Sequence, residues 1–230
     1  MAFASNYRRW IMDSLKPYIG RHIVEVGAGT GAFSELLLAA GPATLTVLEP
    51  SSNLYLRLFE LLGPIDSAGV VHLYQSNFPD VWNGNTQIHT PDTVVYINVL
   101  EHIEHDETEL KTVFGALAPG GRILIFVPAL PFLMSSMDRE LGHFRRYTLP
   151  QLVAKCSSAG FIIKTARYLD LLGVAPWWIK YRLLKSNTME AGAVRAHDRW
   201  VVPVSRTIES LIKVPFGKNI ILVGEKAGRG

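Results

Sequence analysis

Three glycines at alternate positions, Gly27, Gly29 and Gly31, stand directly after a short β-branched run, with Ala28 between the first two. Glycine accepts a positive φ and lets main-chain amides approach a ligand closely. The helical pattern that begins at Ala32 would direct its positive N-terminal end toward the same place. We interpret this stretch as a cofactor-binding loop at the first strand of a doubly wound sheet.

An acidic residue follows at the spacing expected for a nucleoside cofactor. Glu49 ends the second apolar run, 22 positions after Gly27, and Pro50 comes next. A carboxylate at a strand tip about 20 residues past a glycine loop can accept hydrogen bonds from both hydroxyls of a ribose. Because Gly27, Gly29 and Ala32 also satisfy the pattern G-x-G-x-x-G/A, a nicotinamide dinucleotide remains an alternative ligand.

Two histidines are candidates for proton transfer. His102 lies just beyond the fourth apolar run, where open α/β sheets bind their ligands. In the alternative interpretation, Glu101 and His102 only cap the following turn. His143 is the rival base, because it shares a polar loop with Arg145 and Arg146, which could clamp an anionic acceptor. Equally, these arginines could only tie the loop to acidic neighbours.

A regular alternation of strand and helix patterns would position these residues. Strands are expected at residues 21–26, 43–49, 70–75, 93–99, 122–127, 161–168 and 219–225. Helical patterns separate most of them, which favours parallel βαβ units with right-handed crossovers. Residues 129–147 have neither period, and a loop of that length usually covers or binds a ligand.

Size and composition favour one α/β domain over residues 1–230, with an acceptor-side loop at about 129–148 and a helical insertion at about 171–200. The net charge is +3, and the scattered Lys and Arg do not indicate a nucleic-acid partner. The one cysteine, Cys156, excludes an intramolecular disulfide and a cysteine-based zinc cluster. No apolar segment suits a signal peptide or a membrane span, so we expect a cytoplasmic protein.

Four motifs in this order resemble the class I S-adenosylmethionine-dependent methyltransferases. They are Glu25 to Gly31, Glu49-Pro50, Asn98 to Ile103, and Leu117 to Gly121. A nicotinamide-dependent dehydrogenase would not need the Leu-Glu-His sequence after the fourth strand. The family implies a Rossmann-like, doubly wound, seven-stranded sheet with helices on both faces, whose last strand is antiparallel and inserted next to strand five.

A bacterial small-molecule subgroup of that family is more similar still. It shares an N-terminal Tyr-x-x-Trp helix, a Gly-His-Phe-Arg-Arg-Tyr element after strand five, and a late Pro-Phe-Gly-Lys-Asn segment. In this sequence these are Tyr7 with Trp10, Gly142 to Tyr147, and Pro215 to Asn219. We expect an acceptor-binding set made of Tyr7, Arg145, Arg146 and Tyr147.

The resemblance also implies S-adenosyl-L-methionine as cofactor and S-adenosyl-L-homocysteine as product. The implied cofactor-binding residues are Glu25, Gly27, Ala28, Gly29, Gly31, Glu49, Pro50, Asn77, Phe78 and Asn98. The glycines would face the methionine part, Glu25 would help to organise its amino group, and Glu49 would bind the ribose. Asn77 replaces the more usual aspartate near the adenine amino group, whose hydrogen bond its oxygen can still accept. Phe78 would lie against the adenine ring, and Asn98 near the sulfonium.

Some ubiquinone-pathway O-methyltransferases that resemble this region carry Glu-x-x-Glu-His, which can hold a divalent ion. Asn98 replaces the first acid here, so we expect no required metal. We expect methyl transfer to a small-molecule acceptor, with O-methylation ahead of N- or C-methylation of a lipid-like or isoprenoid acceptor. A non-catalytic cofactor-binding regulatory subunit is the alternative from another class. The pair Trp177-Trp178 is interpreted as an acceptor cover, a homodimer contact or a membrane-docking element.

Overall fold

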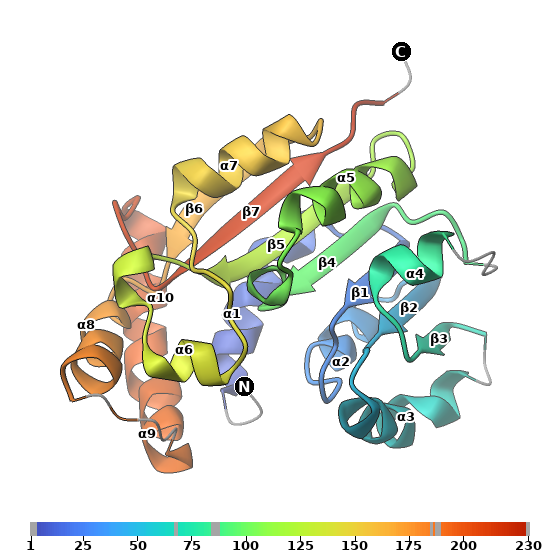
Figure 1. Cartoon of the computed structure of the whole chain (residues 1–230). Coiled ribbons are helices and arrows are strands. Elements are labelled where there is room, and N and C mark those ends of the chain that lie inside the picture. The colour runs from blue at the N-terminus through green and yellow to red at the C-terminus, as the bar shows by residue number, and fades with distance from the viewer. Residues whose placement is uncertain (1–3, 67–68, 84–87, 185, 187–189, 229–230) are drawn as a thin grey trace.

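The computed structural model describes residues 4–66, 69–83, 88–184, 186 and 190–228. In these residues seven strands form one sheet in the order β3-β2-β1-β4-β5-β7-β6 (Figure 1). The strands are β1 (His22–Val26), β2 (Thr44–Leu48), β3 (Val71–Tyr74), β4 (Thr93–Ile97), β5 (Arg122–Pro128), β6 (Ile162–Leu169) and β7 (Asn219–Glu225). Only β7 runs antiparallel to its neighbours, β5 and β6. The expected sheet, with an antiparallel last strand beside strand five, is confirmed.

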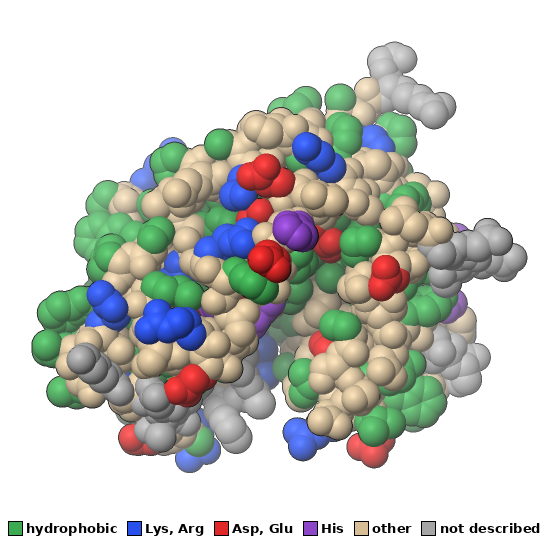
Figure 2. Space-filling view, in the orientation of Figure 1, with side chains coloured by type: hydrophobic (Ala, Val, Ile, Leu, Met, Phe, Trp, Pro, Cys, Tyr) green, Lys and Arg blue, Asp and Glu red, His purple; other side chains and the backbone are tan. Residues whose placement is uncertain are grey.

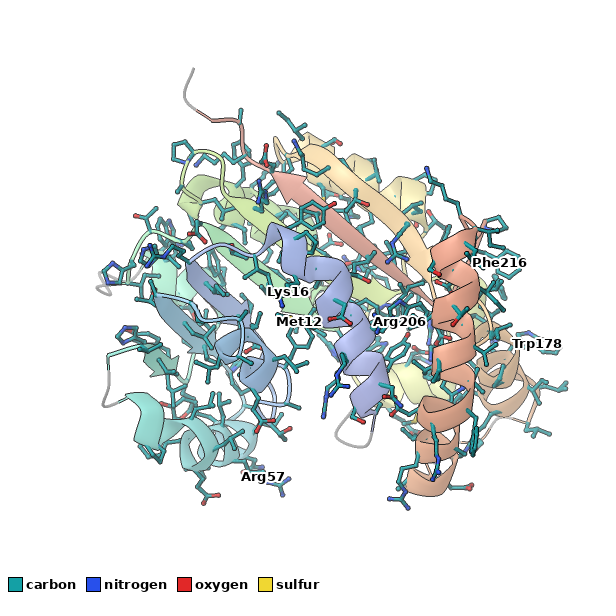
Figure 3. The ribbon with its side chains drawn as sticks, turned by 180° about the vertical axis from the view of Figure 1, so that it is seen from behind. Met12, Lys16, Arg57, Trp178, Arg206 and Phe216 are labelled. Carbon is teal, nitrogen blue, oxygen red and sulfur yellow. The ribbon has the colours of Figure 1, made fainter. Side chains whose placement is uncertain are left out.

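Helices pack on both faces of the sheet and give it two cores. One face is covered by α1 (Ser5–Leu15), α2 (Ser34–Leu38), α3 (Ser52–Asp66) and α10 (Val202–Leu211). The other face is covered by α4 (Phe78–Asn83), α5 (Asp106–Ala116) and α7 (Leu149–Ser158). Figure 3 shows α1 lying across the back of the sheet with α10 beside it. The Arg206 guanidinium of α10 and the Asp13 carboxylate of α1 form an ion pair at 2.9 Å.

The buried strands explain why the sheet lies in the middle of the molecule. All five residues of β2 are buried, as are four of the five in β1. Strands that are buried on both faces in this way are typical of parallel sheets that helices cover on both sides. In α1 the buried side chains Tyr7, Trp10, Ile11 and Leu15 recur at helical spacing, so one face of the helix packs on the sheet.

The stretch 129–147 is more regular than its lack of periodicity predicts. It contains a 3₁₀ turn, η3 (Pro131–Leu133), and a short helix, α6 (Ser136–Glu140). A capping box starts α6: the Ser135 hydroxyl accepts from the Asp138 amide, and the Asp138 carboxylate accepts from the Ser135 amide. The expected loop therefore includes a short helix and a 3₁₀ turn, which show no period because they have only five and three residues.

A chain of short helices follows β6. It consists of α8 (Val174–Trp177), the π-helical turn η4 (Trp178–Leu183), α9 (Ala191–Ala196), the π-helical turn η5 (His197–Val201) and α10. Residues 185 and 187–189 of the expected insertion lie outside the described residues. Figure 1 shows α8, α9 and α10 grouped beside α6, on the side of the molecule away from β3. Within the described part of the chain, no helix has the length and apolar character needed to cross a bilayer.

Candidate active site

A cavity of about 690 Å³ lies where β1, β2 and β4 end. Its wall includes five of the residues expected to bind the cofactor: Gly27, Glu49, Pro50, Asn77 and Asn98. Cavities of this size at the carboxyl ends of parallel strands are the usual ligand sites of doubly wound folds. The space-filling view shows the surface hollowed between the α3 side and the α8–α10 side of the same face (Figure 2).

The glycine loop adopts the backbone that its composition predicts. Gly27, Gly29 and Gly31 have φ values of 65°, 61° and 80°. A Cβ on Gly27 would lie 2.6 Å from Val99 Cγ2, whereas a Cβ on Gly29 would meet nothing within 4 Å. Gly27 is therefore required both because a Cβ would clash with Val99 and because its φ is positive. For Gly29 only the positive φ favours glycine in the free protein.

Glu49 joins the loop to the tip of β2. Its carboxylate accepts a hydrogen bond from the Gly29 amide at 2.7 Å and another from the Ser51 amide at 2.9 Å. The side chain is buried yet lies on the cavity wall. A fixed carboxylate with further lone pairs toward the cavity suits two neighbouring hydroxyls, and its role toward a ribose remains a prediction.

The other five expected cofactor residues, Glu25, Ala28, Gly29, Gly31 and Phe78, do not lie on the cavity wall. Ala28, Gly29 and Gly31 belong to the loop that continues from Gly27, whereas Glu25 and Phe78 are buried elsewhere. Glu25 is buried beneath the loop, where its carboxylate accepts a hydrogen bond of 2.5 Å from the Ser34 hydroxyl at the start of α2. Burial raises the pKa of Glu25 to about 7, although the bond from Ser34 opposes the shift. Phe78 is also buried and stacks on Trp82, with ring centroids 6.4 Å apart. Both placements are corrected: Glu25 braces the loop, and Phe78 belongs to the core.

Asn77 reaches the cavity wall but has a local task as well. Its side-chain oxygen accepts from the Asp80 amide at 3.1 Å, and its side-chain nitrogen donates to the Asp80 carboxylate at 2.7 Å. The residue therefore caps the N-terminus of α4. An aspartate would fill the same cap, so replacing it with Asn keeps the helix start while removing a charge from the cavity.

A second cavity of about 610 Å³ adjoins the first. Asn98 and His102 line both cavities, so these two residues mark the border. Asn98 ends β4 with a φ of 53°, and its amide donates to the Phe126 carbonyl at 2.8 Å. Asparagine is one of the few residues that adopt this left-handed backbone readily. The chain thus turns sharply at the point where the two cavities meet.

His102 and His143 come together at this border. Their ring centroids are 4.6 Å apart and the ring planes are nearly perpendicular, at 87°. Both side chains line the second cavity, and His102 is exposed to it. Burial of the ring and the neighbouring His143 lower the pKa of His102. The two histidines that the sequence offers as rival bases therefore form one cluster.

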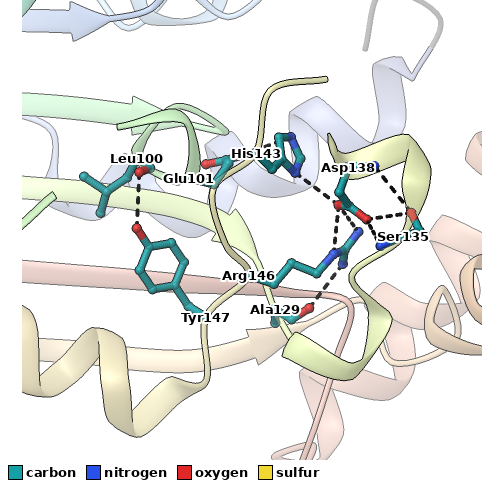
Figure 4. A network of polar contacts seen from close by, with 8 residues as sticks. All are labelled: Leu100, Glu101, Ala129, Ser135, Asp138, His143, Arg146 and Tyr147. Atoms are coloured by element: carbon teal, nitrogen blue, oxygen red, sulfur yellow. Dashed lines mark hydrogen bonds and ion pairs between the residues drawn. The ribbon is translucent and has the colours of Figure 1, made fainter. Parts of the chain in front are cut away.

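Arg146 lies in the wall of the second cavity, tightly held by Asp138. Its guanidinium lies 2.7 Å from the Asp138 carboxylate and also donates to the Ala129 carbonyl at 3.2 Å (Figure 4). The same carboxylate accepts hydrogen bonds from Ser135 and contacts Nδ1 of His143 at 3.1 Å. These contacts hold the pKa of Asp138 well below its usual range, despite its burial. The side chain of Arg146 is therefore fixed in the cavity wall, and its positive charge is already paired with Asp138.

Arg145 and Tyr147 do not reach either cavity, which corrects their expected role in acceptor binding. Arg145 pairs with the Asp106 carboxylate at 2.8 Å and donates to the Glu104 carbonyl at 2.7 Å. The buried Tyr147 hydroxyl donates to Asp106 at 2.8 Å and lies 3.2 Å from the Leu100 carbonyl. Because successive side chains of an extended segment point to opposite sides, Arg146 faces the cavity and its two neighbours face α5.

Tyr7 lies in the wall of the second cavity, as expected, and distant residues hold it there. Its hydroxyl donates to Asn219 Oδ1 at 2.8 Å, and its amide donates to Asp198 Oδ1 at 2.8 Å. The Lys218 ammonium lies 5.0 Å from the centre of the Tyr7 ring and pairs with Asp170 at 2.7 Å. The sequence did not lead us to expect Asp198 and Lys218 at the site. Lys218 belongs to the Pro-Phe-Gly-Lys-Asn segment shared with the bacterial subgroup, and that segment was the available signal for it.

The helical chain after β6 closes the second cavity with aromatic side chains. Trp177 and Tyr181 line it, with ring centroids 4.4 Å apart, and the Arg146 guanidinium lies 4.7 Å from the Trp177 ring centre. Trp178 is 43% exposed and is absent from the wall. The two neighbouring tryptophans therefore have different environments.

Comparison with known proteins gives a family and a fold. A family model described as a methyltransferase domain matches residues 6–170. A curated relative, ribosomal RNA small subunit methyltransferase A of Maridesulfovibrio salexigens, is 42% identical over 50 residues. That match covers 22% of this chain and 19% of the relative, so it spans only about a fifth of the relative's length.

Two solved structures illustrate the fold. N-methyltransferase NodS from Bradyrhizobium japonicum WM9, in complex with S-adenosyl-L-homocysteine, has a TM-score of 0.59 at 14% identity, covering 97% of this chain and 87% of its own. A SAM-dependent methyltransferase from Archaeoglobus fulgidus has a TM-score of 0.60 at 16% identity, covering 95% and 94%. At these identities the similarity concerns the fold.

Proposed function

This chain belongs to the methyltransferase domain family, and on that premise we propose that it transfers a methyl group from S-adenosylmethionine to a small-molecule acceptor. The observation that carries the proposal is the pair of adjoining cavities with Asn98 and His102 at their border. Methyl transfer requires two ligands that meet along one line, since the acceptor atom attacks the methyl carbon opposite the departing sulfur.

The first cavity is assigned to the cofactor. Gly27 lies on its wall, and Glu49 offers its carboxylate at the strand tip. Asn98 then lies at the end of the cofactor nearest the acceptor, as the family resemblance implies for the sulfonium. When bound, the cofactor supplies a methyl group on positively charged sulfur, which is an excellent leaving group. The protein therefore has to align the acceptor and to favour loss of its proton.

The second cavity is assigned to the acceptor. Its wall combines the rings of Tyr7, Trp177 and Tyr181 with several polar and charged side chains. The aromatic part suits an aromatic or isoprenoid molecule with one reactive polar atom. An anionic clamp is not supported, because the cations in the wall are already paired and Arg145 faces elsewhere. Arg146 pairs with Asp138, Lys218 with Asp170 and Lys180 with Glu190. We propose an uncharged acceptor of limited polarity for this cavity.

O-methylation is our proposed reaction. The border histidines His102 and His143 would favour loss of a proton from an acceptor hydroxyl. With that proton taken up by an imidazole or released to solvent, the acceptor oxygen would take the methyl group that the bound cofactor supplies, and S-adenosylhomocysteine would be the product. One structural neighbour is named as an N-methyltransferase and another as an O-methyltransferase family protein, so the fold does not favour either reaction. The proposal that oxygen is methylated therefore depends on the histidine cluster.

The test is turnover of cofactor with a radiolabelled methyl group against a panel of phenols, polyprenyl alcohols and amines. We expect label transfer to a hydroxyl acceptor and release of S-adenosylhomocysteine, with turnover reduced at least tenfold in His102→Ala and cofactor affinity unchanged. An exposed control, His105→Ala, should behave as wild type. Cofactor binding without turnover on the panel would support the regulatory-subunit alternative instead. Transfer confined to amines would overturn O-methylation.

A further inference from the structure

Glu101 is a buried acid for which the proposed reaction gives no role. Its side chain is fully buried, and neither carboxylate oxygen has a hydrogen-bond partner in the described residues. An ionised carboxylate in this setting carries an uncompensated charge, and a protonated one leaves its O–H and its carbonyl oxygen unpaired. Arg146, whose charge acts on Glu101, is already bonded to Asp138 and Ala129. The site therefore lacks a positive partner.

Two imidazoles flank this acid. One ligand atom each from Glu101, His102 and His143 lies within 4.8 Å of the others. His143 Nε2 lies 4.0 Å from Glu101 Oε1, which is too far for a hydrogen bond between them. All three side chains line the acceptor cavity, and His102 also borders the cofactor cavity.

A carboxylate behind His143 fixes which of its nitrogens faces this gap. Asp138 Oδ1 contacts His143 Nδ1 at 3.1 Å, so a proton on Nδ1 is held there and Nε2 is the nitrogen that faces Glu101 (Figure 4). Metal-binding histidines in proteins are commonly held by a carboxylate on their other nitrogen. Asp138 is in turn anchored by Arg146 and by the capping box with Ser135.

We propose that Glu101, His102 and His143 form a binding site for one divalent transition-metal ion, with Zn²⁺ as the reference ligand. Two imidazoles and one carboxylate with further positions open toward a cavity are the donor set of catalytic zinc and non-haem iron sites. Ligand atoms around tetrahedral Zn²⁺ are about 3.3 Å apart. Separations of up to 4.8 Å must therefore shorten by up to about 1.5 Å. Rotation of the exposed His102 can bring its ring closer, and the 4.0 Å between Glu101 Oε1 and His143 Nε2 must shorten by about 0.7 Å.

This site deepens the proposed function and rests on it for the position of the acceptor. With the ion bound, His102 and His143 would serve as its ligands, and the ion instead of a free imidazole would favour loss of the acceptor proton. A divalent ion beside the acceptor cavity would balance the charge of Glu101 and stabilise the deprotonated form of an acceptor hydroxyl. Such an ion would favour acceptors whose hydroxyl is acidic, or whose hydroxyl lies next to a second oxygen that can also bind the ion. The sequence led us to expect no required metal because Asn98 replaces an acid. The third ligand comes instead from His143, which is 41 positions after His102 and invisible to a local motif.

The experiment measures metal binding without acceptor or turnover. Untagged protein is treated with EDTA, desalted and titrated with Co²⁺, whose visible absorption reports nitrogen and oxygen ligands, and then with Zn²⁺ as competitor. We expect one Co²⁺ per chain, displacement by one Zn²⁺, and a higher Tm with Zn²⁺. His102→Ala and Glu101→Gln should weaken Zn²⁺ binding at least tenfold, while the exposed control His105→Ala should leave it unchanged.

The outcomes separate this proposal from the proposed function. His102→Ala changes an exposed side chain, so it should fold even if Glu101→Gln does not. Absence of saturable Co²⁺ and Zn²⁺ binding in the wild type, or equal binding by His102→Ala, would overturn the metal site. S-adenosylhomocysteine binding is measured by calorimetry on the same metal-free sample. Cofactor binding without metal binding would therefore refute this inference alone.

Discussion

Single residues decide whether the first cavity can hold a nucleoside, and Glu49 is the most specific of them. Glu49→Gln keeps the size of the side chain, but its amide nitrogen would face the donor amide of Gly29 or Ser51. Hydrogen bonds to a charged group contribute about 1.5–3 kcal/mol, so we expect at least tenfold weaker binding of S-adenosylhomocysteine in calorimetry. Glu60→Gln on the exposed side of α3 is the matched control. Unchanged affinity in Glu49→Gln would remove Glu49 from the site.

Glu25 gives a prediction about pH. Its folded-state pKa of about 7 lies above the ordinary value of 4.5, because burial disfavours the charged form. The protein should therefore lose stability as pH rises from about 4.5 to about 7, by up to about 3 kcal/mol. Glu25→Gln removes this loss and can still accept the bond from Ser34. We expect the Tm of the variant relative to wild type to be about 5 °C higher at pH 8 than at pH 5. Parallel Tm curves from pH 5 to 8 would contradict this assignment.

Residue identity could be predicted only where neighbours in sequence are neighbours in space. The glycines and Glu49 belong to one β-turn-α unit and the strand beside it, and the structure places them together. The sequence could not show which of Arg145 and Arg146 faces the cavity. It also could not show that Asp138 claims the charge of Arg146, because that pairing depends on the fold of α6.

At the scale of elements, two glycines of the same loop allow the effect of a packing clash to be measured apart from the effect of backbone strain. Gly27→Ala forces a Cβ against Val99 at a positive φ, whereas Gly29→Ala meets only the φ penalty of about 1–2 kcal/mol. We expect a larger fall in Tm for Gly27→Ala than for Gly29→Ala. Adding Val99→Ala should restore part of the Tm of Gly27→Ala but none of that of Gly29→Ala. Equal Tm losses in the two glycine variants would contradict this prediction, because the clash between the new Cβ at position 27 and Val99 would then cost no stability.

A second element-scale prediction concerns the start of α1. Asp198 in η5 accepts hydrogen bonds from the amides of Asn6 and Tyr7, so it caps a helix from almost 200 residues away. Loss of a cap costs about 1–2 kcal/mol. Asp198→Ala should lower the Tm and speed hydrogen exchange at the first amides of α1. Asp198→Asn keeps an acceptor oxygen, so its Tm and exchange rates should lie between those of the wild type and Asp198→Ala. Exchange that stays at the wild-type rate in Asp198→Ala would count against the cap.

Elements were predictable to different degrees for physical reasons. The strands are buried on both faces and bounded by turn residues, so their positions follow from composition, and the seven expected ranges agree with the observed strands within a residue or two. The helices α6, α8 and α9 have four to six residues each, too few for a hydrophobic period. Their positions depend on distant contacts such as Arg146 with Asp138 and Trp177.

At the scale of the whole molecule, the fold brings the loop after β5, the helices after β6 and the N-terminal helix together around one cavity. The cofactor cavity, by contrast, is built from consecutive βα units on the other side of Asn98 and His102. This division explains why sequence motifs indicate the cofactor more clearly than the acceptor. Residues of the acceptor cavity come from segments that are distant in sequence and have no common spacing.

The central claim is that the first cavity binds S-adenosylmethionine and its product. Calorimetric titration of the purified protein with S-adenosylhomocysteine tests it most directly, with NADH titrated in parallel. We predict saturable binding of one S-adenosylhomocysteine per chain and no binding of NADH. Binding of NADH without S-adenosylhomocysteine, or of neither S-adenosylhomocysteine nor S-adenosylmethionine, would contradict the claim.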